Sequence, residues 1–222
     1  MIGYSVHHCE QRTAEWFECR RGRLTGSVAG DITAKGRDSG EAVKRRDLRM
    51  RLALERLTGK CLDSGGGYQS AAMKRGTELE PEARAMYEAI SGRMVSEVGF
   101  VASGCGRLGY SPDAVVVDAD FRITHVLELK CPEWAAHLGY LQTGGKIGKD
   151  YEAQVAHGFL VTGCDSLDWM SYHPDFPEKL QHKLLSFTRE SWAEAIAQHA
   201  AHVATFFADV DAQMAEIESL AL

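Results

Sequence analysis

The chain has 222 residues, of which 45% are apolar and 25% charged, and a mean hydropathy of −0.25, which fits one well-formed core. No stretch approaches the roughly 18 uninterrupted apolar residues that a membrane span needs. The net charge of −6 argues against a protein that coats nucleic acid, but not against an enzyme that holds DNA in one local basic channel.

Cysteine usage gives a further constraint. The six cysteines show neither a CxxC pair nor a short repeated spacing; they are Cys9, Cys19, Cys61, Cys105, Cys131 and Cys164. We expect free thiols in a reducing compartment, rather than a disulfide framework or a zinc or iron–sulfur site. The N-terminal segment has no apolar stretch of the signal-peptide type. The predicted location is therefore the cytoplasm, with no membrane partner.

The N-terminal part is predicted to be helical. A short helix is expected over 13–21, closed by Gly22, and a second helix from about Thr25–Ser27. A longer helix is predicted over 40–59, with apolar positions at Val43, Leu48, Leu52 and Leu57. The Gly-rich segment 61–70 lacks the GK[ST] ending of a phosphate-binding loop and is interpreted as a flexible connector.

The middle of the chain is predicted to alternate helices and strands. Helices are expected over about 77–91, ending near Gly92, and over 147–162. Strands are expected at 94–101, 107–111, 114–118 and 122–131, the last two forming a hairpin, and also within 163–176 and 180–189.

A long Ala-rich helix is predicted from Ser191 to the end. Its apolar residues recur every seven positions, with three more alongside: Ile196, Val203, Val210 and Ile217, then Trp192, Phe206 and Leu220. We expect this stripe to pack on the sheet, with oligomer contact as an alternative. No repeat or linker is apparent. The order of elements predicts one α/β domain over 1–222, with a central mixed β-sheet flanked by helices. Within it, 1–60 is a helical part, 75–190 the core and 191–222 the final helix.

The segment "HVLELKCP", 125–132, places two charges inside an apolar strand. On a strand, Glu128 and Lys130 point to one face, while Leu127, Leu129 and Cys131 point to the other. For this segment alone, an amphipathic strand with an ion pair is the simpler interpretation.

A second carboxylate changes that interpretation. Pro112-Asp113 lies fifteen positions before Glu128, so a hairpin can bring the two carboxylates together. Mg²⁺ prefers oxygen ligands and usually takes only one or two carboxylates. Lys130 beside such an ion would hold the attacking water or, with a lowered pKa, accept its proton. Metal and lysine together would offset the charge that grows on a phosphodiester.

These residues carry a family resemblance. Pro112-Asp113…Glu128-Leu129-Lys130 is the PD-(D/E)xK nuclease signature. Four further segments have the order and spacing of one group within it: "EWFECRRGRLTGS" at 15–27, "RGTELEPEARAMYE" at 75–88, "SPDAVV" at 111–116 and "DYEAQVAHGFLVTG" at 150–163. Over about 15–165 the chain thus resembles the phage-lambda-type exonucleases of viral recombination. The resemblance implies a restriction-endonuclease-like core.

The resemblance also implies a set of catalytic residues. Asp113 and Glu128 would bind metal with the backbone carbonyl of Leu129, and Lys130 would be the catalytic lysine. Glu80 would lie near the metals, and Gln154 would orient water or phosphate. The implied cofactor is Mg²⁺, with two ions expected and Mn²⁺ as a substitute.

Two of these assignments have simpler rivals. Thr77-x-x-Glu80 fits a capping box with Pro81 in the first turn, so Glu80 could close a helix end. Gln154 could be a surface glutamine.

A second site is predicted for a terminal phosphate. Arg20 ends one helix, and Thr25 and Ser27 lie where the next begins, so N–H groups, hydroxyls and a guanidinium gather there. The resemblance places a 5′-phosphate at this point, with Ser111 as a further donor. The alternative is that Thr25 or Ser27 caps the helix while Arg20 pairs with an acid.

Other features are less specific. Met73 would separate the DNA strands, or would be part of the core. His199 and His202 have the spacing of a metal pair but no third ligand, and we expect packing or surface positions. Basic residues of the third helix would touch duplex phosphates or be a solvated face; they are Lys44, Arg45, Arg46, Arg49 and Arg51.

The sequence therefore predicts a Mg²⁺-dependent exonuclease that degrades one strand of duplex DNA 5′→3′ from 5′-phosphorylated ends. It would release mononucleotides and leave a 3′ single strand for an annealing recombinase. The family resemblance implies a homotrimeric ring around DNA. The alternatives are a restriction- or repair-type endonuclease on the same core, and an inactive DNA-binding recombination scaffold.

Overall fold

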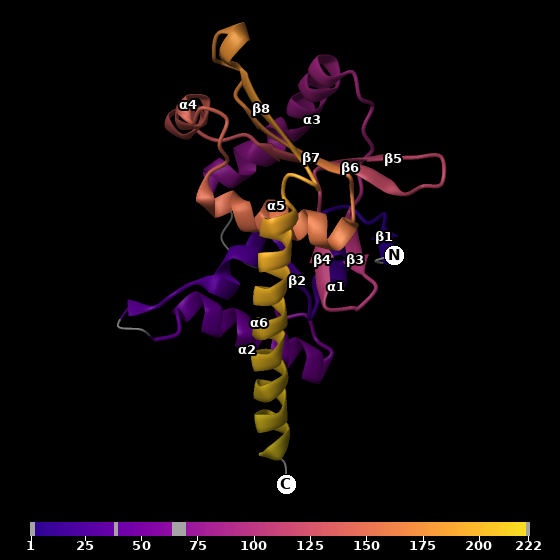
Figure 1. Cartoon of the computed structure of the whole chain (residues 1–222), viewed down its shortest axis with the longest axis vertical. Helices are drawn as coiled ribbons and strands as arrows, with labels where there is room; N and C mark the ends of the chain where they lie inside the picture. Colours follow the sequence, from indigo (N-terminus) through magenta and orange to yellow (C-terminus); the bar gives the residue numbers. More distant parts are fainter. Residues whose placement is uncertain (1–2, 38–39, 64–69, 221–222) are drawn as a thin grey trace.

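The computed structural model describes residues 3–37, 40–63 and 70–220, so most of the connector predicted at 61–70 lies outside the described residues. The fold is mixed α/β, as predicted, but it contains two four-stranded sheets instead of the single sheet that we expected (Figure 1). Among the described helices, none is long and apolar enough to cross a membrane.

The first sheet has the strand order β1-β3-β4-β2. Its members are β1 (Tyr4–His7), β2 (Leu24–Thr25), β3 (Phe100–Ser103) and β4 (Leu108–Tyr110). β2 runs parallel to β4, and the other pairs are antiparallel. The strand predicted at 94–101 is wrong in position: β3 begins only at Phe100, and the segment before it contributes a single bridge, Ser96 to Val115. β1 was not predicted.

The second sheet has the strand order β5-β6-β7-β8. Its members are β5 (Ala114–Val117), β6 (Ile123–Lys130), β7 (Ser166–Tyr172) and β8 (His182–Thr188). The predicted β5–β6 hairpin is confirmed, with Ala114 opposite Leu127, and β6 runs parallel to β7. The chain passes from the first sheet to the second between Tyr110 and Ala114, so Asp113 lies at this crossing.

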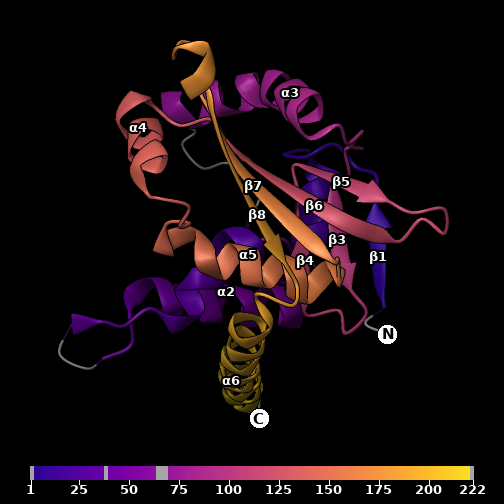
Figure 2. The same cartoon turned by 45° about the horizontal axis from the view of Figure 1, so that its top comes forward.

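Helices surround the two sheets. They are α1 (Ala14–Arg20), the 3₁₀ helix η1 (Gly26–Thr33), α2 (Val43–Thr58), α3 (Ala71–Ser91), α4 (Trp134–Gln142), α5 (Lys149–Thr162), the 3₁₀ helix η3 (Glu178–Leu180) and α6 (Ala193–Ser219). Figure 2 shows α3 and α5 on opposite faces of the second sheet. The predicted apolar stripe of α2 is correct at Leu48 and Leu52, but Val43 is 63% exposed. α4 was not predicted.

Helix α3 corrects one interpretation of Glu80. Ser70 caps the helix, because its hydroxyl accepts a hydrogen bond from the Met73 N–H at 3.2 Å. Thr77 lies in the helix interior and donates its hydroxyl to the Met73 carbonyl at 3.0 Å. Pro81 also lies inside the helix. The capping box at Thr77 and Glu80 is therefore wrong, and Glu80 does not close a helix end.

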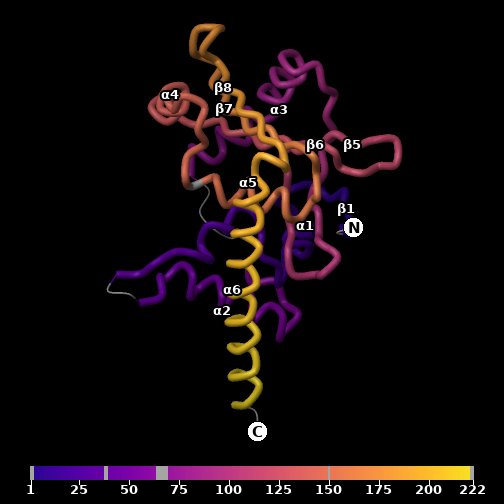
Figure 3. The backbone as a smooth tube through the Cα atoms, viewed as in Figure 1, coloured from indigo at the N-terminus to yellow at the C-terminus, as the bar shows by residue number. Residues whose placement is uncertain are grey.

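Helix α6 packs on other helices, not on a sheet as we expected. It contacts α2, α5 and η1 through buried residues such as Val203, Phe206 and Val210. Figure 3 traces α6 alongside α2 and away from the sheets. Apolar ridges of adjacent helices pack into one another's grooves and bury this stripe, whereas Leu220 at the C-terminal end is 82% exposed.

Two buried histidines join α5, β4 and α6. The Nε2 of His157 lies 3.1 Å from the Gly109 carbonyl, and its Nδ1 lies 3.0 Å from Nε2 of His199. Both contacts are satisfied with neutral rings when His157 donates to Gly109 and accepts from His199. Burial and the neighbouring His199 lower the pKa of His157 to about 3, and burial and His202 lower the pKa of His199 to about 4.

These pKa values predict acid sensitivity. In the unfolded chain each ring takes a proton below about pH 6.5, whereas the folded rings stay neutral. Stability is complete above pH 6.5 and is lost as the pH falls toward 4. We expect His157→Gln to reduce the loss of unfolding free energy between pH 7.5 and pH 5 by about 2 kcal/mol. Urea denaturation of both proteins at the two pH values measures this; equal losses would contradict it.

Candidate active site

Glu128 is the centre of a buried polar cluster on the α5 face of the second sheet. Its carboxylate is 1% exposed and accepts three hydrogen bonds: from the Tyr110 hydroxyl at 2.6 Å, from Lys130 Nζ at 2.9 Å and from Gln154 Nε2 at 2.7 Å. A buried carboxylate keeps its charge only when it is hydrogen-bonded and paired in this way. The structure thus brings Glu128, Lys130 and Gln154 together and excludes the interpretation of Gln154 as a surface residue.

Asp113 joins this cluster from the position just before β5. Its N–H donates to the Leu127 carbonyl at 3.1 Å, which continues the hairpin beyond the Ala114–Leu127 pair, and its Oδ2 accepts the Leu129 N–H at 2.6 Å. Burial, and then the charge of Glu128, raise the pKa of Asp113 to about 7, although Lys130 acts in the opposite direction. The two neighbouring carboxylates therefore repel each other, and a cation between them would relieve that repulsion.

Lys130 is a charged donor in this arrangement. Burial alone would lower its pKa, but the carboxylates of Glu128 and Asp113 raise it well above its usual value. The Tyr151 ring lies 5.4 Å from the ammonium and adds a cation–π contact. Without a cation the ammonium form is therefore favoured, and the alternative in which Lys130 has a lowered pKa and accepts a proton from water stays a prediction.

Strand alternation explains why these side chains meet. Leu127 and Leu129 point into the core beneath α3, so Glu128 and Lys130 must face α5. On that side Val126 packs in the larger core, and Gln154 comes from α5.

Tyr110 is a site residue that sequence reasoning missed. It ends β4, three positions before Asp113, and is buried. A Cβ at Gly26 or at Gly158 would lie only 2.7 Å or 2.9 Å from its ring, so these glycines make room for it. A tyrosine in a strand predicts only packing, and nothing local in the sequence shows that its hydroxyl meets Glu128.

Glu80 stands apart from this cluster. It accepts a hydrogen bond from Arg12 Nη2 at 3.2 Å and lines, with Asp113, a cavity of about 590 Å³. The charge of Glu80 also contributes to the raised pKa of Asp113, after burial and Glu128. Glu80 thus lies near Asp113, on the wall of the cavity that the two residues share, and its role beside the metals stays a prediction.

The residues predicted for the 5′-phosphate form one network. Arg20 Nη2 lies 3.2 Å from the Thr25 hydroxyl and 3.4 Å from the Ser27 hydroxyl. The Trp16 ring lies under the guanidinium, and its indole N–H donates to the Ser111 hydroxyl at 2.9 Å. Trp16 therefore links Arg20 to Ser111, a connection that the sequence did not reveal.

The alternative roles of these residues fit less well. Neither Thr25 nor Ser27 forms a side-chain cap on η1. The carboxylate of Asp63 lies 3.9 Å from Arg20, so an acid partner exists, but at long range. The buried Arg20 Nε has no partner. Because Nε is shielded from solvent, the guanidinium would meet an anion through the Nη2 that already contacts Thr25 and Ser27.

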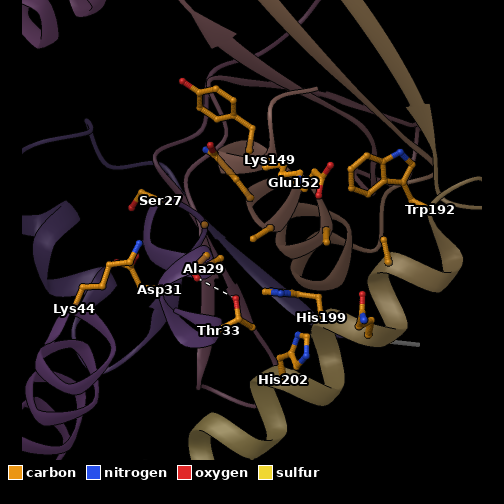
Figure 4. Close-up of a pocket in the computed structure, with 18 of the residues that line it drawn as sticks. Ser27, Ala29, Asp31, Thr33, Lys44, Lys149, Glu152, Trp192, His199 and His202 are labelled. Carbon is orange, nitrogen blue, oxygen red and sulfur yellow. Dashed lines mark hydrogen bonds and ion pairs between the residues drawn. The ribbon is translucent and has the colours of Figure 1, made fainter. Parts of the chain in front are cut away.

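A second cavity, of about 980 Å³, opens beside Lys130 and Gln154 between η1, α5 and the start of α6. Figure 4 shows Ser27 on one wall, Lys149 and Glu152 on another, and His199 and His202 on α6. Lys130 and Gln154 are therefore reachable from solvent through this cavity, and Asp113 through the 590 Å³ cavity.

The less specific predictions have mixed outcomes. Met73 is 59% exposed, which excludes the core alternative and leaves its role in strand separation a prediction. His199 is buried by packing, as expected. All six cysteines are free thiols, as expected.

The five basic residues of α2 each pair with a carboxylate of the chain: Lys44 with Asp31, Arg45 with Asp209, Arg46 with Asp47, Arg49 with Glu41 and Arg51 with Asp63. Their contact with duplex DNA stays a prediction.

The donor set of the cluster fits a hard divalent cation. Within residues 3–37, 40–63 and 70–220, no three His, Cys, Asp or Glu side chains form a group that could hold a metal ion by themselves. Mg²⁺ nevertheless needs only one or two carboxylates and completes its shell with water and phosphate oxygens. Asp113 and Glu128 supply two carboxylates that interact electrostatically, and their unrelieved repulsion points the same way.

Comparison with known proteins identifies the family of this chain. The family profile of the YqaJ-like viral recombinase domain matches residues 15–165. The chain belongs to the YqaJ-like viral recombinase family. The match covers Arg20, Asp113, Glu128, Lys130 and Gln154, so both site clusters lie within the family's domain. The resemblance to viral recombination nucleases is thereby confirmed.

Solved structures support this membership in the YqaJ-like family. An alkaline exonuclease, LHK-Exo, from Laribacter hongkongensis is 33% identical, with a TM-score of 0.78 over 94% of this chain and 98% of that one. The same exonuclease in complex with dAMP gives a TM-score of 0.79. A phage-related exonuclease from Haemophilus somnus 129PT shares the fold, at 13% identity and a TM-score of 0.62 over 88% and 96%. No curated protein sequence matches the chain.

Proposed function

We propose that the chain is a Mg²⁺-dependent nuclease that degrades one strand of duplex DNA 5′→3′ from 5′-phosphorylated ends. The observation that carries the proposal is the hydrogen-bonded cluster of Glu128, Lys130 and Gln154 beside a cavity that Lys130 and Gln154 line. Asp113 lies close enough for the charges of Glu128 and Lys130 to shift its pKa. Family membership and the LHK-Exo relative, an exonuclease, support a nuclease acting on DNA.

In this proposal Asp113 and Glu128 would hold the cation, with the Leu129 carbonyl and Glu80 as further oxygen donors. Such a cation, when bound, lowers the pKa of water and neutralises charge on the phosphodiester. Two Mg²⁺ ions, replaceable by Mn²⁺, remain our expectation.

The chain's own residues would supply positioning and charge. Lys130, held by Glu128, would place a permanent positive charge beside the scissile phosphate and donate to its oxygens. Gln154, held by the same carboxylate, would orient water or phosphate. Tyr110 would hold the Glu128 carboxylate in place through the hydrogen bond from its hydroxyl. In the reaction one water is consumed, its oxygen bonds to phosphorus, and the 3′-oxygen of the terminal nucleotide leaves with a proton.

This polarity would let the reaction repeat. The phosphate stays on the shortened 5′ end, so each product is again a substrate. Arg20, Thr25, Ser27 and Ser111 would bind that phosphate and set the cut one nucleotide from the end. The proposal takes 1–222 as one nuclease domain, acting as a homotrimeric ring, with a single-strand annealing recombinase receiving the 3′ strand.

The experiment compares three DNA substrates with Mg²⁺: linear duplexes with 5′-phosphate or 5′-hydroxyl ends, and a closed circle. We expect rapid release of mononucleotides from phosphorylated ends, slower release from hydroxyl ends and no cutting of the circle. Arg20→Ala should remove the preference for phosphorylated ends, because the guanidinium is the charged donor of the pocket.

The outcomes separate the rival functions. Cutting of the circle would favour an endonuclease on the same core. No hydrolysis of any substrate, with DNA binding retained, would favour an inactive scaffold. Equal digestion of both linear ends by the wild type would overturn the phosphate pocket alone.

A further inference from the structure

Arg12 has an unusual backbone next to the candidate active site. Its φ is 70°, and Phe121 is the other non-glycine residue with positive φ in the described part of the chain. Side chains of L residues rarely adopt this conformation, and an arginine gains no turn-forming advantage there. A strained backbone that carries a charged side chain suggests that the side chain has a use.

The loop around Arg12 is fixed to the site. Gln11 Nε2 donates to the Pro112 carbonyl at 3.0 Å, one residue before Asp113. Thr13 caps α1 and donates its hydroxyl to the Glu10 carbonyl at 2.7 Å. Arg12 is therefore held from both sides, and its direction is set by the fold.

The fixed loop points Arg12 at Glu80. The guanidinium Nη2 lies 3.2 Å from Glu80 Oε1, and both residues line the 590 Å³ cavity that also contains Asp113. The two side chains are 45% and 26% exposed, so water screens the pair only partly. Arg12 is thus the counter-ion of Glu80, which the proposed function uses as a third carboxylate beside Asp113 and Glu128.

We propose that Arg12 is a positioning residue that competes with the divalent cation for the carboxylate of Glu80. This inference rests on the proposed function. While Arg12 holds Glu80, that carboxylate offers less negative charge to a cation at Asp113 and Glu128. Arg12 thereby weakens cation binding to the free protein and keeps a cluster of three carboxylates from repelling one another when no cation is present.

Calorimetric titration of Mg²⁺ and Mn²⁺ into DNA-free protein tests this. We expect Arg12→Gly and Arg12→Gln to bind the cation up to about fivefold more tightly than wild type. Glycine also relieves the backbone and glutamine does not, so equal effects assign the change to charge. Arg12→Lys should bind like wild type. Arg84→Gln is the matched control, because Arg84 lines the same cavity but pairs with Glu97 at 2.6 Å.

A double-mutant cycle with Glu80→Gln decides the mechanism. If Arg12 acts through Glu80, its effect on cation affinity should disappear once Glu80 has lost its charge. In the Glu80→Gln background, Arg12→Gln should therefore change the affinity by less than about 1.5-fold. An undiminished effect there, or wild-type affinity in Arg12→Gln itself, would overturn the inference. Neither result would contradict the proposed nuclease function. That function fails separately if the wild type binds no divalent cation and releases no nucleotides.

Discussion

Lys130→Ala is expected to slow DNA hydrolysis by about 10²–10³-fold while DNA binding stays nearly unchanged. The ammonium is held 2.9 Å from Glu128, and the neighbouring carboxylates raise its pKa, so it supplies a fixed charge where a phosphate would develop more charge. Duplex affinity comes from many phosphate contacts and should hardly depend on one half-buried lysine. Single-turnover digestion and a gel-shift titration measure the two effects.

Controls separate chemistry from folding. Lys130→Ala leaves Glu128 with only Tyr110 and Gln154 as partners, so its melting temperature must be compared with wild type. Lys130→Gln keeps a donor near Glu128 without the charge and should be as inactive. Lys149→Ala removes an exposed lysine that lines the same cavity and should stay active. Full activity of Lys130→Ala, or equal losses in Lys149→Ala, would contradict the assigned role.

Asp113→Asn is expected to lower hydrolysis by about 10³-fold or more, since the substitution removes one of two anionic oxygen donors for the cation. The same change should raise the melting temperature in the presence of EDTA. Burial and Glu128 raise the pKa of Asp113 to about 7, so the ionised form is disfavoured in the folded protein. The asparagine carbonyl can still accept the Leu129 N–H, but it carries no charge to repel Glu128.

The sign of this effect depends on pH. A carboxyl whose folded pKa is raised stabilises the fold fully below its unfolded pKa, about 3.9, and loses that contribution as the pH rises to 7. The stabilisation by Asp113→Asn should therefore be small at pH 4 and largest at pH 8. Calorimetric melting of both proteins in EDTA measures it. A lower melting temperature for Asp113→Asn at pH 8 would contradict the repulsion between Asp113 and Glu128.

The cluster on β6 was predictable because strand alternation is a local rule. Leu127 and Leu129 mark the buried face, so Glu128 and Lys130 must share the other, and a hairpin then brings Asp113 close. Arg20, Thr25 and Ser27 were also predictable, since they lie within eight residues of one another.

The missed features depend on contacts between distant segments. Tyr110 reaches Glu128 only because the chain changes sheets at 111–113, and no period in the sequence encodes that crossing. The capping alternative for Glu80 arose because Thr77 and Glu80 have cap spacing, whereas the helix is capped by Ser70, seven residues before Thr77. Arg12 carries no sequence signal, since arginine is not a residue that usually adopts positive φ.

The most direct test is a calorimetric titration of Mg²⁺ into the wild type and into Asp113→Asn, both without DNA. We predict a saturable binding isotherm for the wild type and its loss in Asp113→Asn, with both proteins folded by circular dichroism. An unchanged isotherm in Asp113→Asn would mean that the carboxylates of Asp113 and Glu128 do not hold the cation together.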